Sequence, residues 1–302
     1  MFRALHNQAR LVLKIRPVSP VLIKSAGSGL DPTRPEMEFV TIHTELGRVE
    51  YLPGSTLKGV MRSFTERLLL GLGKKVCDPL EKKSLCAERE HRSYSRQCDV
   101  CKLFGSPNLA GRLRVVDGLP WRVDAPDEER QAGRAELKRE IRANVAIDRA
   151  SGASSSKGLF DMDVLVGGAL YPELSLRNYQ LWQLALTWLA LKELDTGFLQ
   201  IGGGKSRGLG RVSCEVTLLE IRQIGSLANP DEVRGVGAVT GESLRQYRLG
   251  DPDRSPLPEG VARFSDGPLS EGRYVGEAAR SVLAATLASE PWRRFVEGGG
   301  AQ

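Results

Sequence analysis

Apolar and polar residues alternate near the start of the chain and then change to a helical period. The stretch ARLVLKIRPVSPVLIKS, residues 9–25, predicts one or two strands with a break at Pro17 and Pro20. A hairpin that turns near Leu46–Gly47 follows. Residues 55–70 predict a helix, since apolar residues recur there at helical spacing: Leu57, Val60, Met61, Phe64 and Leu68. The chain therefore begins with a sheet, a polar loop and a helix.

Both periods return in the second half of the chain. Residues 144–177 alternate around a Ser/Gly-rich tip at 151–156, which predicts a long hairpin. Asn178 is the predicted N-cap of a helix, YQLWQLALTWLALKEL, and a last core strand, RVSCEVTLL, follows it. From about residue 223, Pro, Gly and charged residues become frequent, with one helix predicted at 275–296. This composition predicts a loosely packed C-terminal extension.

Composition narrows the class of partner. In 302 residues, 43 Lys and Arg outnumber 37 Asp and Glu, so the net charge is +6. The isoelectric point is near 9.1, and such an excess of positive charge fits a polyanionic partner. No apolar run approaches the ~20 residues of a membrane span, and the N-terminus lacks the apolar stretch of a signal peptide. We therefore expect a cytoplasmic protein with no membrane contact.

Four of the five cysteines are clustered with the spacing C-x8-C-x11-C-x2-C. The final C-x2-C pair can direct two thiolates to one tetrahedral ion, and its polar surroundings offer little core of their own. A structural Zn²⁺ is predicted rather than four unrelated thiols, with the ligands Cys77, Cys86, Cys98 and Cys101. His91 is an alternative to one of them. Cys214 lies in an apolar strand, where we expect it to be a buried small hydrophobe.

The start of the helix at residues 55–70 carries an unexpected charge. Ser55 is a good N-cap, but Lys58 and Arg62 place cations near a helix N-terminus, where the macrodipole favours an anion. A bound phosphate would satisfy both the free N–H groups and these cations.

A second candidate binding segment is the Gly-rich stretch LQIGGGKSRGLGRVSCEV. Consecutive glycines around Gly203 let a backbone approach a ligand closely, and Lys205 and Arg207 add positive charge. The spacing is neither G-x-G-x-x-G nor a Walker A motif, which excludes a nucleotide cofactor and leaves a plain turn as the alternative. Arg149 and Lys157 flank the hairpin tip and suit contact with a nucleic-acid backbone.

Four segments in order resemble the landmarks of the RAMP superfamily: YLPGSTLKGVMRSFTERL, the cysteine knuckle running into CKLFGS, the hairpin AIDRASGASSSKGLFDMDVLVGG, and IGGGKSRGLGRV. More specifically, they resemble the crRNA-binding backbone subunit of type III CRISPR effector complexes, in the zinc-knuckle, type III-D-like branch. The resemblance implies an α+β fold, a ferredoxin-like, RRM-like β-α-β-β-α-β palm with a β-hairpin thumb and an inserted zinc knuckle. The implied domains are residues 1–72 for the first part of the palm, 73–106 for the knuckle, 107–222 for the rest of the palm with the thumb at about 120–160, and 223–302 for the loosely structured extension.

The resemblance also implies partners and contacts. Guide phosphates would be held at the helix start by Ser55, Lys58, Gly59 and Arg62, and Gly203, Lys205 and Arg207 would lie along the same RNA backbone. The thumb, with residues 149–157 at its tip, would wedge between guide and target. The partners would be crRNA, complementary target RNA, other CRISPR effector subunits and further RAMP subunits in a filament. Base pairing would read the sequence, so the protein needs backbone and shape contacts.

Active members of this family cut target RNA with one Asp after the first strand and a divalent metal, Mg²⁺ or Mn²⁺. The target's own 2′-OH attacks the adjacent phosphate, so one carboxylate suffices. The matching loop here holds Asp31, Glu36 and Glu38 as candidates. Ungapped counting back from Pro53 reaches Glu38 instead of an Asp, and Asp31 equally fits an Asx turn. A subunit that binds RNA without cutting it is therefore an alternative.

Two further functions stay open at this point. A standalone RAMP endoribonuclease that processes guide precursor RNA would use a His as general acid or base, and His43 alone lies near the helix start. A non-catalytic, zinc-containing RNA-binding module outside CRISPR biology is the other.

Overall fold

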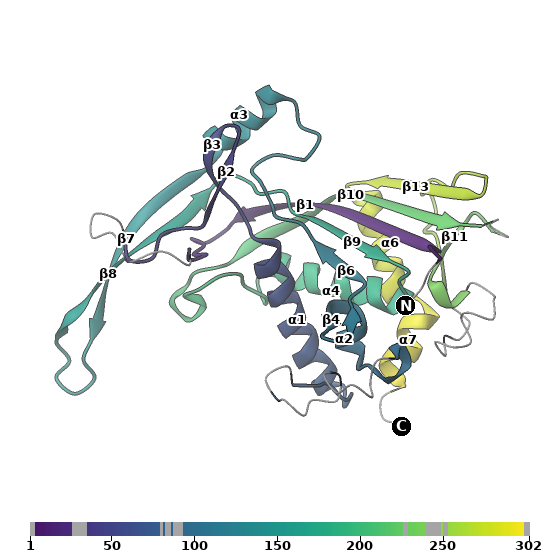
Figure 1. Ribbon diagram of the computed structural model, residues 1–302, viewed down its shortest axis with the longest axis horizontal. Helices are drawn as coiled ribbons and strands as arrows, with labels where there is room; N and C mark the ends of the chain where they lie inside the picture. The colour runs from purple at the N-terminus through teal and green to yellow at the C-terminus, as the bar shows by residue number, and fades with distance from the viewer. Residues whose placement is uncertain are drawn as a thin grey trace.

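The computed structural model describes residues 4–25, 35–78, 81, 86, 93–225, 229–238, 249 and 253–298. A five-stranded antiparallel sheet of order β13-β10-β1-β9-β6 lies at its centre (Figure 1). The strands are β1 (Asn7–Pro17), β6 (Leu113–Val115), β9 (Glu173–Arg177), β10 (Val212–Ile224) and β13 (Leu269–Val275).

Two long helices connect these strands in a recognisable order. Helix α1 (Gly54–Gly71) lies between β1 and β6, and α4 (Leu181–Thr196) lies between β9 and β10. The chain thus runs β-α-β-β-α-β, and its four strands are arranged β10-β1-β9-β6. This order is that of a ferredoxin-like palm, so the predicted α+β fold is confirmed.

The core lies between one face of the sheet and the helices. On β1, Ala9, Leu11, Leu13 and Ile15 are at most 2% exposed and join the main apolar cluster, to which α1 and α4 contribute. The intervening residues face the other side, where Arg10 forms ion pairs with carboxylates of β9 and β10. The period-2 pattern of β1 therefore separates an apolar face from a charged one.

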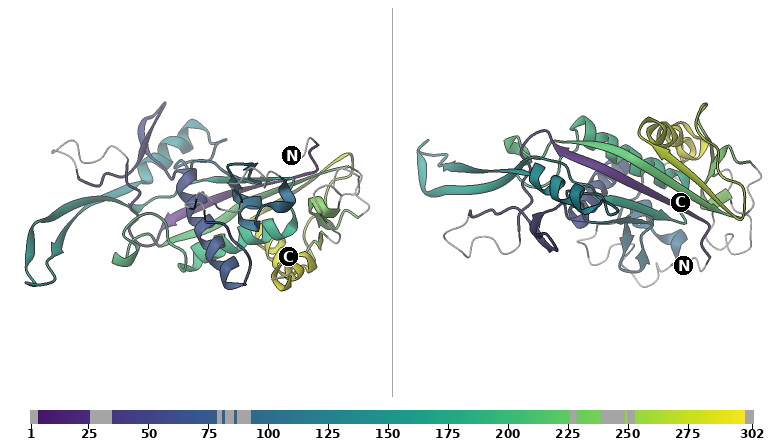
Figure 2. Two further views of the ribbon diagram at one scale, coloured as in Figure 1. Left: turned by 60° about the horizontal axis from the view of Figure 1, so that its bottom comes forward. Right: turned by 90° about the horizontal axis from the view of Figure 1, so that it is seen from above.

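A long two-stranded hairpin projects from the palm (Figures 1 and 2). It consists of β7 (Lys138–Ile147) and β8 (Ser154–Gly167), paired from Lys138↔Gly167 to Ile147↔Ser154. Its outer part leaves apolar side chains exposed: Ile141, Val145, Ile147 and Leu159. The predicted β-hairpin thumb is present. Helix α3 (Asp127–Glu136) and the short hairpin of β2 (Thr41–Thr44) and β3 (Gly47–Glu50) lie at its base.

An insertion separates α1 from β6. It contains short elements: the 3-10 turn Tyr94–Arg96, helix α2 (Asp99–Phe104), β4 (Gly105–Ser106) and β5 (Leu109–Ala110). The side chains of Val100, Leu103 and Phe104 join the main core, so α2 is attached to the palm by apolar packing as well as by the chain.

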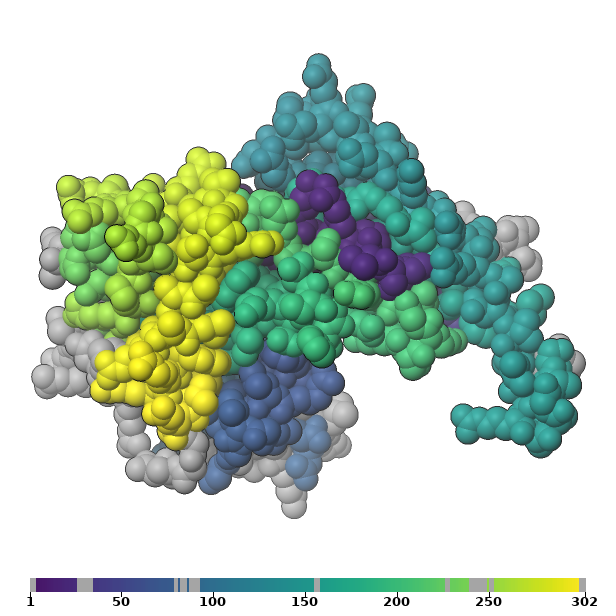
Figure 3. All heavy atoms as spheres, turned by 180° about the vertical axis from the view of Figure 1, so that it is seen from behind, coloured from purple at the N-terminus to yellow at the C-terminus, as the bar shows by residue number. Residues whose placement is uncertain are grey.

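The C-terminal region is more closely packed than its composition predicted. Strand β13 pairs with β10, and helices α6 (Glu277–Ala288) and α7 (Glu290–Glu297) replace the single predicted helix. Phe295 stacks on Trp182 of α4 with ring centroids 4.4 Å apart. In Figure 3 the yellow C-terminal segment lies against the teal and blue parts of the chain that hold α4 and α1. Strands β11 (Glu232–Arg234) and β12 (Arg254–Pro256) form a separate pair. The domain boundaries stay a prediction.

Both helix caps predicted from the sequence were wrong. Helix α1 begins at Gly54, with Pro53 as its N-cap, and the Asp117 carboxylate accepts a hydrogen bond from the Gly54 N–H at 2.7 Å. Helix α4 begins three residues later than Asn178, with Gln180 and Gln183 forming a reciprocal capping box. Asn178 instead has a φ of 48° and accepts a hydrogen bond from the His6 N–H.

Candidate functional site

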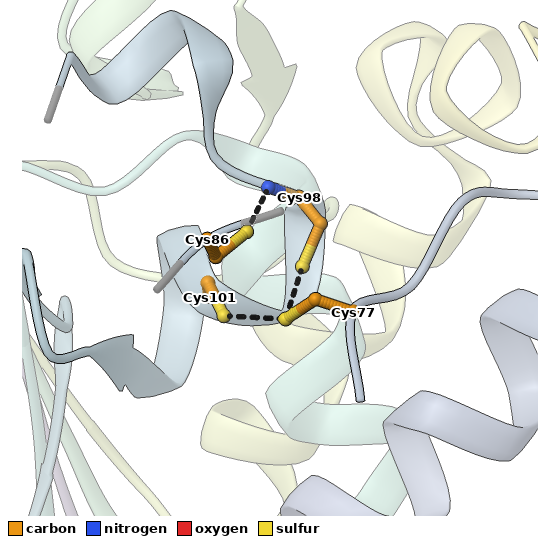
Figure 4. A group of neighbouring side chains, drawn as sticks. All are labelled: Cys77, Cys86, Cys98 and Cys101. Atoms are coloured by element: carbon orange, nitrogen blue, oxygen red, sulfur yellow. Dashed lines mark hydrogen bonds between the residues drawn. The ribbon is translucent and has the colours of Figure 1, made fainter. Parts of the chain in front are cut away.

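The four predicted cysteine ligands converge on one point (Figure 4). Cys77 follows α1, Cys98 is the N-cap of α2, and Cys101 lies in its first turn. Together with Cys86, their sulfur atoms all lie within 4.8 Å of one another. The Cys77 Sγ is 3.3 Å from that of Cys101 and 3.6 Å from that of Cys98. A tetrahedral ion with Zn–S bonds of ~2.3 Å separates its sulfurs by ~3.8 Å, so the cluster can hold a metal ion after small adjustments.

The surroundings of the cysteines suit thiolate ligands. The Cys98 N–H donates to the Cys86 Sγ at 3.1 Å. Hydrogen bonds from Cys101 and Cys86 hold the pKa of the Cys98 thiol well below its usual range, whereas contacts with Cys86 and Cys98 raise the pKa of the Cys101 thiol. A metal ion bound by these thiolates would displace the protons that the sulfurs otherwise carry. Four protein ligands leave no open position, which is typical of a structural site. His91 lies outside the described residues.

The fifth cysteine behaves as its sequence context predicted. Cys214 is 4% exposed in β10, and burial raises the pKa of its thiol to about 12.

The start of α1 presents a lysine without a counter-charge. Ser55 and Gly59 are exposed, and Lys58 is half-buried. Within the described part of the chain Lys58 forms no ion pair or hydrogen bond. Burial, followed by the nearby charge of Arg62, lowers the pKa of Lys58. No larger residue can replace Gly54 without a backbone shift, because its Cβ would lie 2.5 Å from the Val115 carbonyl oxygen. At Gly59, by contrast, a Cβ would meet open space.

Among the residues that the structure describes, Arg62, unlike Lys58, forms an ion pair and hydrogen bonds. Its guanidinium donates to Glu66 Oε1 at 2.8 Å, to the Gly105 oxygen at 3.1 Å and to the Cys101 Sγ at 3.8 Å. The structure thus directs Arg62 toward the cysteine cluster, although its position in the sequence suggested a role beside Lys58.

In the Gly-rich loop, Gly203 is a glycine that the backbone conformation of the loop does not require. Gly202 and Gly204 have φ near +70°, and a Cβ on Gly202 would lie 2.1 Å from the Leu22 oxygen. Gly203 is exposed and lies between them with only ordinary contacts around an added Cβ. Lys205 and Arg207 are exposed, and Arg207 lies 5.7 Å from the centre of the Phe160 ring of β8.

The loop, the thumb base and the segment after β1 meet in one small apolar cluster. It contains Leu22, Met162, Val164 and Leu209. Leu22 also forms an isolated bridge with Gly203. The structure therefore brings the Gly-rich loop and the thumb together. At the thumb tip, Arg149 is exposed in a turn held by Asp148, and Lys157 lies in β8, but its side chain is outside the described set.

Two of the three candidate carboxylates, Glu36 and Glu38, flank Met37, which bridges to Met162 at the thumb base. Asp31 falls outside the described residues, Glu36 is exposed, and Glu38 is half-buried. Asp163 of β8, a 5% exposed carboxylate near Glu38, was not among the residues predicted from the sequence. Asp163 accepts from the Phe39 N–H at 3.4 Å and pairs with Arg139 at 2.9 Å. Asp163 lies inside a strand and its partner Phe39 is far away in the sequence, so no local sequence pattern marks it as a site residue.

Within the described ranges, the four cysteines are the one group of three or more residues placed to share a metal ion. None of the helices described is both long and apolar enough to cross a membrane.

The fold, the cysteine cluster and the thumb together define a class of protein: an α+β palm with a protruding hairpin and a cysteine-rich insertion. Residues 14–213 match the sequence model of the RAMP superfamily. The chain belongs to this superfamily, and the resemblance found in its sequence is confirmed at that level. Comparison with curated proteins gives no match.

Proposed function

We propose that this chain is the crRNA-binding backbone subunit of a type III CRISPR effector complex. Membership in the RAMP superfamily supports a CRISPR-associated RNA-binding role. The observation that carries the proposal is Lys58, a half-buried cation near the start of α1 that is unpaired within the described residues. A guide phosphate would supply its counter-charge, and the adjacent helix N-terminus also favours an anion.

The path of the guide follows from the residues left accessible. From Ser55, Lys58 and Gly59 it would pass the Gly-rich loop, where Gly203, Lys205 and Arg207 are exposed. The thumb, with Arg149 near its tip and Lys157 in β8, would enter the guide–target duplex. These contacts address phosphates and helix shape, which suits an RNA whose sequence is read by base pairing.

The metal and the partners complete the proposal. The cysteine cluster would hold Zn²⁺ as a structural ion, because four thiolates match its preferred tetrahedral geometry. Other effector subunits, and further RAMP subunits along the same guide, would be the protein partners. Complementary target RNA would pair with the guide.

Replacing Gly59 with Ala is expected to change stability and RNA binding in opposite directions. The free energy of unfolding should rise by about 0.5–1 kcal/mol, because Ala is the better helix former and its Cβ meets open space. RNA affinity should fall about 10-fold, since the methyl group would prevent close approach of the guide backbone. Chemical denaturation and filter binding measure the two effects. Ser63→Ala, at an exposed position of the same helix, is the control and should leave RNA affinity unchanged. RNA binding undiminished by Gly59→Ala would contradict the proposed contact.

Sequencing the RNA that copurifies with the protein from its native host tests the proposed function. A mixture of guides that share one repeat-derived tag is the expected result. Tight binding to an unprocessed repeat hairpin would favour a standalone processing endoribonuclease. Other cellular RNA would indicate an RNA-binding module outside CRISPR biology, and either of these outcomes would overturn the proposal.

A further inference from the structure

We propose that Arg62 is an outer-shell partner of the metal–thiolate centre and does not contact RNA. The proposal rests on the cysteine cluster as a metal site and is independent of which RNA the protein binds. Arg62 would act through the ligand Cys101 and so is a positioning residue of the metal site.

The guanidinium of Arg62 points into the protein. All three of its nitrogens have acceptors inside the protein: Nε faces Glu66, Nη1 faces the Gly105 oxygen, and Nη2 faces the Cys101 Sγ. The side chain is only 26% exposed. These contacts use one donor on each nitrogen and fix the orientation of the planar group, so turning Arg62 toward a phosphate would break them.

Two of the three acceptors of Arg62 belong to α2 and its C-terminal end, the element that presents Cys101. Gly105 ends α2 with a φ of 101°, and Cys101 lies in the same short helix. Arg62 therefore holds both a metal-binding thiol and the C-terminal end of the element that presents it. Glu66, one turn further along α1, fixes the guanidinium from the other side at 2.8 Å.

The charge of a metal–thiolate centre also favours a guanidinium beside it. A divalent ion bound by four thiolates has a net charge of about −2, which is costly to keep in a partly buried site. A guanidinium hydrogen-bonded to one sulfur offsets part of this charge. Lys102 lies next to Cys101 in the sequence, but its ammonium pairs with Asp99 at 2.9 Å. Arg62 is therefore the better placed of the two cations to offset the charge of the sulfurs.

Metal affinity of the full chain, measured by competition with a chromophoric chelator for Zn²⁺, tests the proposal. We expect Arg62→Gln to weaken Zn²⁺ binding by about 10- to 100-fold, the usual effect of losing an outer-shell partner. The matched control is Arg67→Gln on the same helix, where the exposed arginine donates to the Ser63 oxygen and should leave metal affinity unchanged. Unchanged metal affinity in Arg62→Gln would overturn the proposal.

Two further readouts separate this role from a general loss of structure. With Co²⁺ as the probe, Arg62→Gln should move the thiolate-to-metal charge-transfer band to lower energy, because a hydrogen bond that stabilises the sulfur lone pairs is lost. In RNA binding, Lys58→Ala should reduce the slope of log K against log salt by about one, whereas Arg62→Gln should leave it unchanged. An Arg62→Gln variant with the wild-type Co²⁺ spectrum and a reduced salt slope would make Arg62 an RNA contact.

Discussion

Cys101→Ser is expected to release the metal ion and to lower the free energy of unfolding by about 4 kcal/mol or more. Structural zinc contributes folding free energy directly, and serine is a poor replacement for a thiolate ligand. The effect should reach the palm, because Val100, Leu103 and Phe104 of α2 belong to the main apolar core. The melting temperature should fall by about 10 °C, and elemental analysis should show no bound metal.

Cys214→Ala provides the matched control for this substitution. This cysteine is buried in β10 outside the cluster, so its loss should leave the metal content unchanged. Elemental analysis of the wild-type protein also identifies the ion, and iron in place of zinc would revise the assignment. A Cys101→Ser protein with full metal content and an unchanged melting temperature would show that the cysteines are not a metal site.

In the assembled complex, Glu38→Gln is expected to slow metal-dependent cleavage of target RNA by about 100-fold or more. Removing a single group that stabilises charge in the transition state usually slows a reaction by about this factor. Glu38 precedes Phe39, which bridges to Lys24 and donates to Asp163, so its backbone is fixed beside the thumb base. The assay compares a 5′-labelled target, complementary to the bound guide, in Mg²⁺ and in EDTA.

Glu36→Gln and Asp31→Ala accompany this test. Glu36 is exposed in the same loop and should be dispensable, which makes it the matched control. If Asp31→Ala alone abolished cleavage, the catalytic carboxylate would be Asp31. An intact target, with guide and target still bound, would make this subunit a scaffold and assign any cutting to its neighbours.

Local patterns in the sequence were sufficient for helix α1 and the cysteine cluster, whereas the palm was predicted from the resemblance to the RAMP superfamily. The period of residues 55–70 predicted α1 to within one residue at each end, and cysteine spacing alone selected the four sulfurs that converge. Caps could not be predicted in the same way. The Gly54 N–H is satisfied by Asp117, a residue 63 positions away, so the favourable local choice of Ser55 was not used.

Arg62 and Asp163 show the same limit within the site. At the sequence level Arg62 is one more cation near a helix start, and only the approach of Gly105 and Cys101 redirects it. In the sequence, Asp163 looks like an ordinary charged residue of an alternating hairpin. Only the fold shows that it accepts hydrogen bonds from the Phe39 N–H and from Arg139. Contacts between segments distant in the chain decide both roles, and neither periodicity nor spacing records them.

Strand β13 has a consequence for the behaviour of the folded chain in solution. Along Leu218–Ile224 it satisfies the backbone groups of β10, whose far side is already paired with β1. Without it, this stretch of a thirteen-residue strand would be an open template for pairing with another polypeptide. β13 is shorter and carries the exposed, charged Glu271 and Arg273, which discourage further strand addition. The C-terminal region therefore protects the palm against aggregation through its sheet edge.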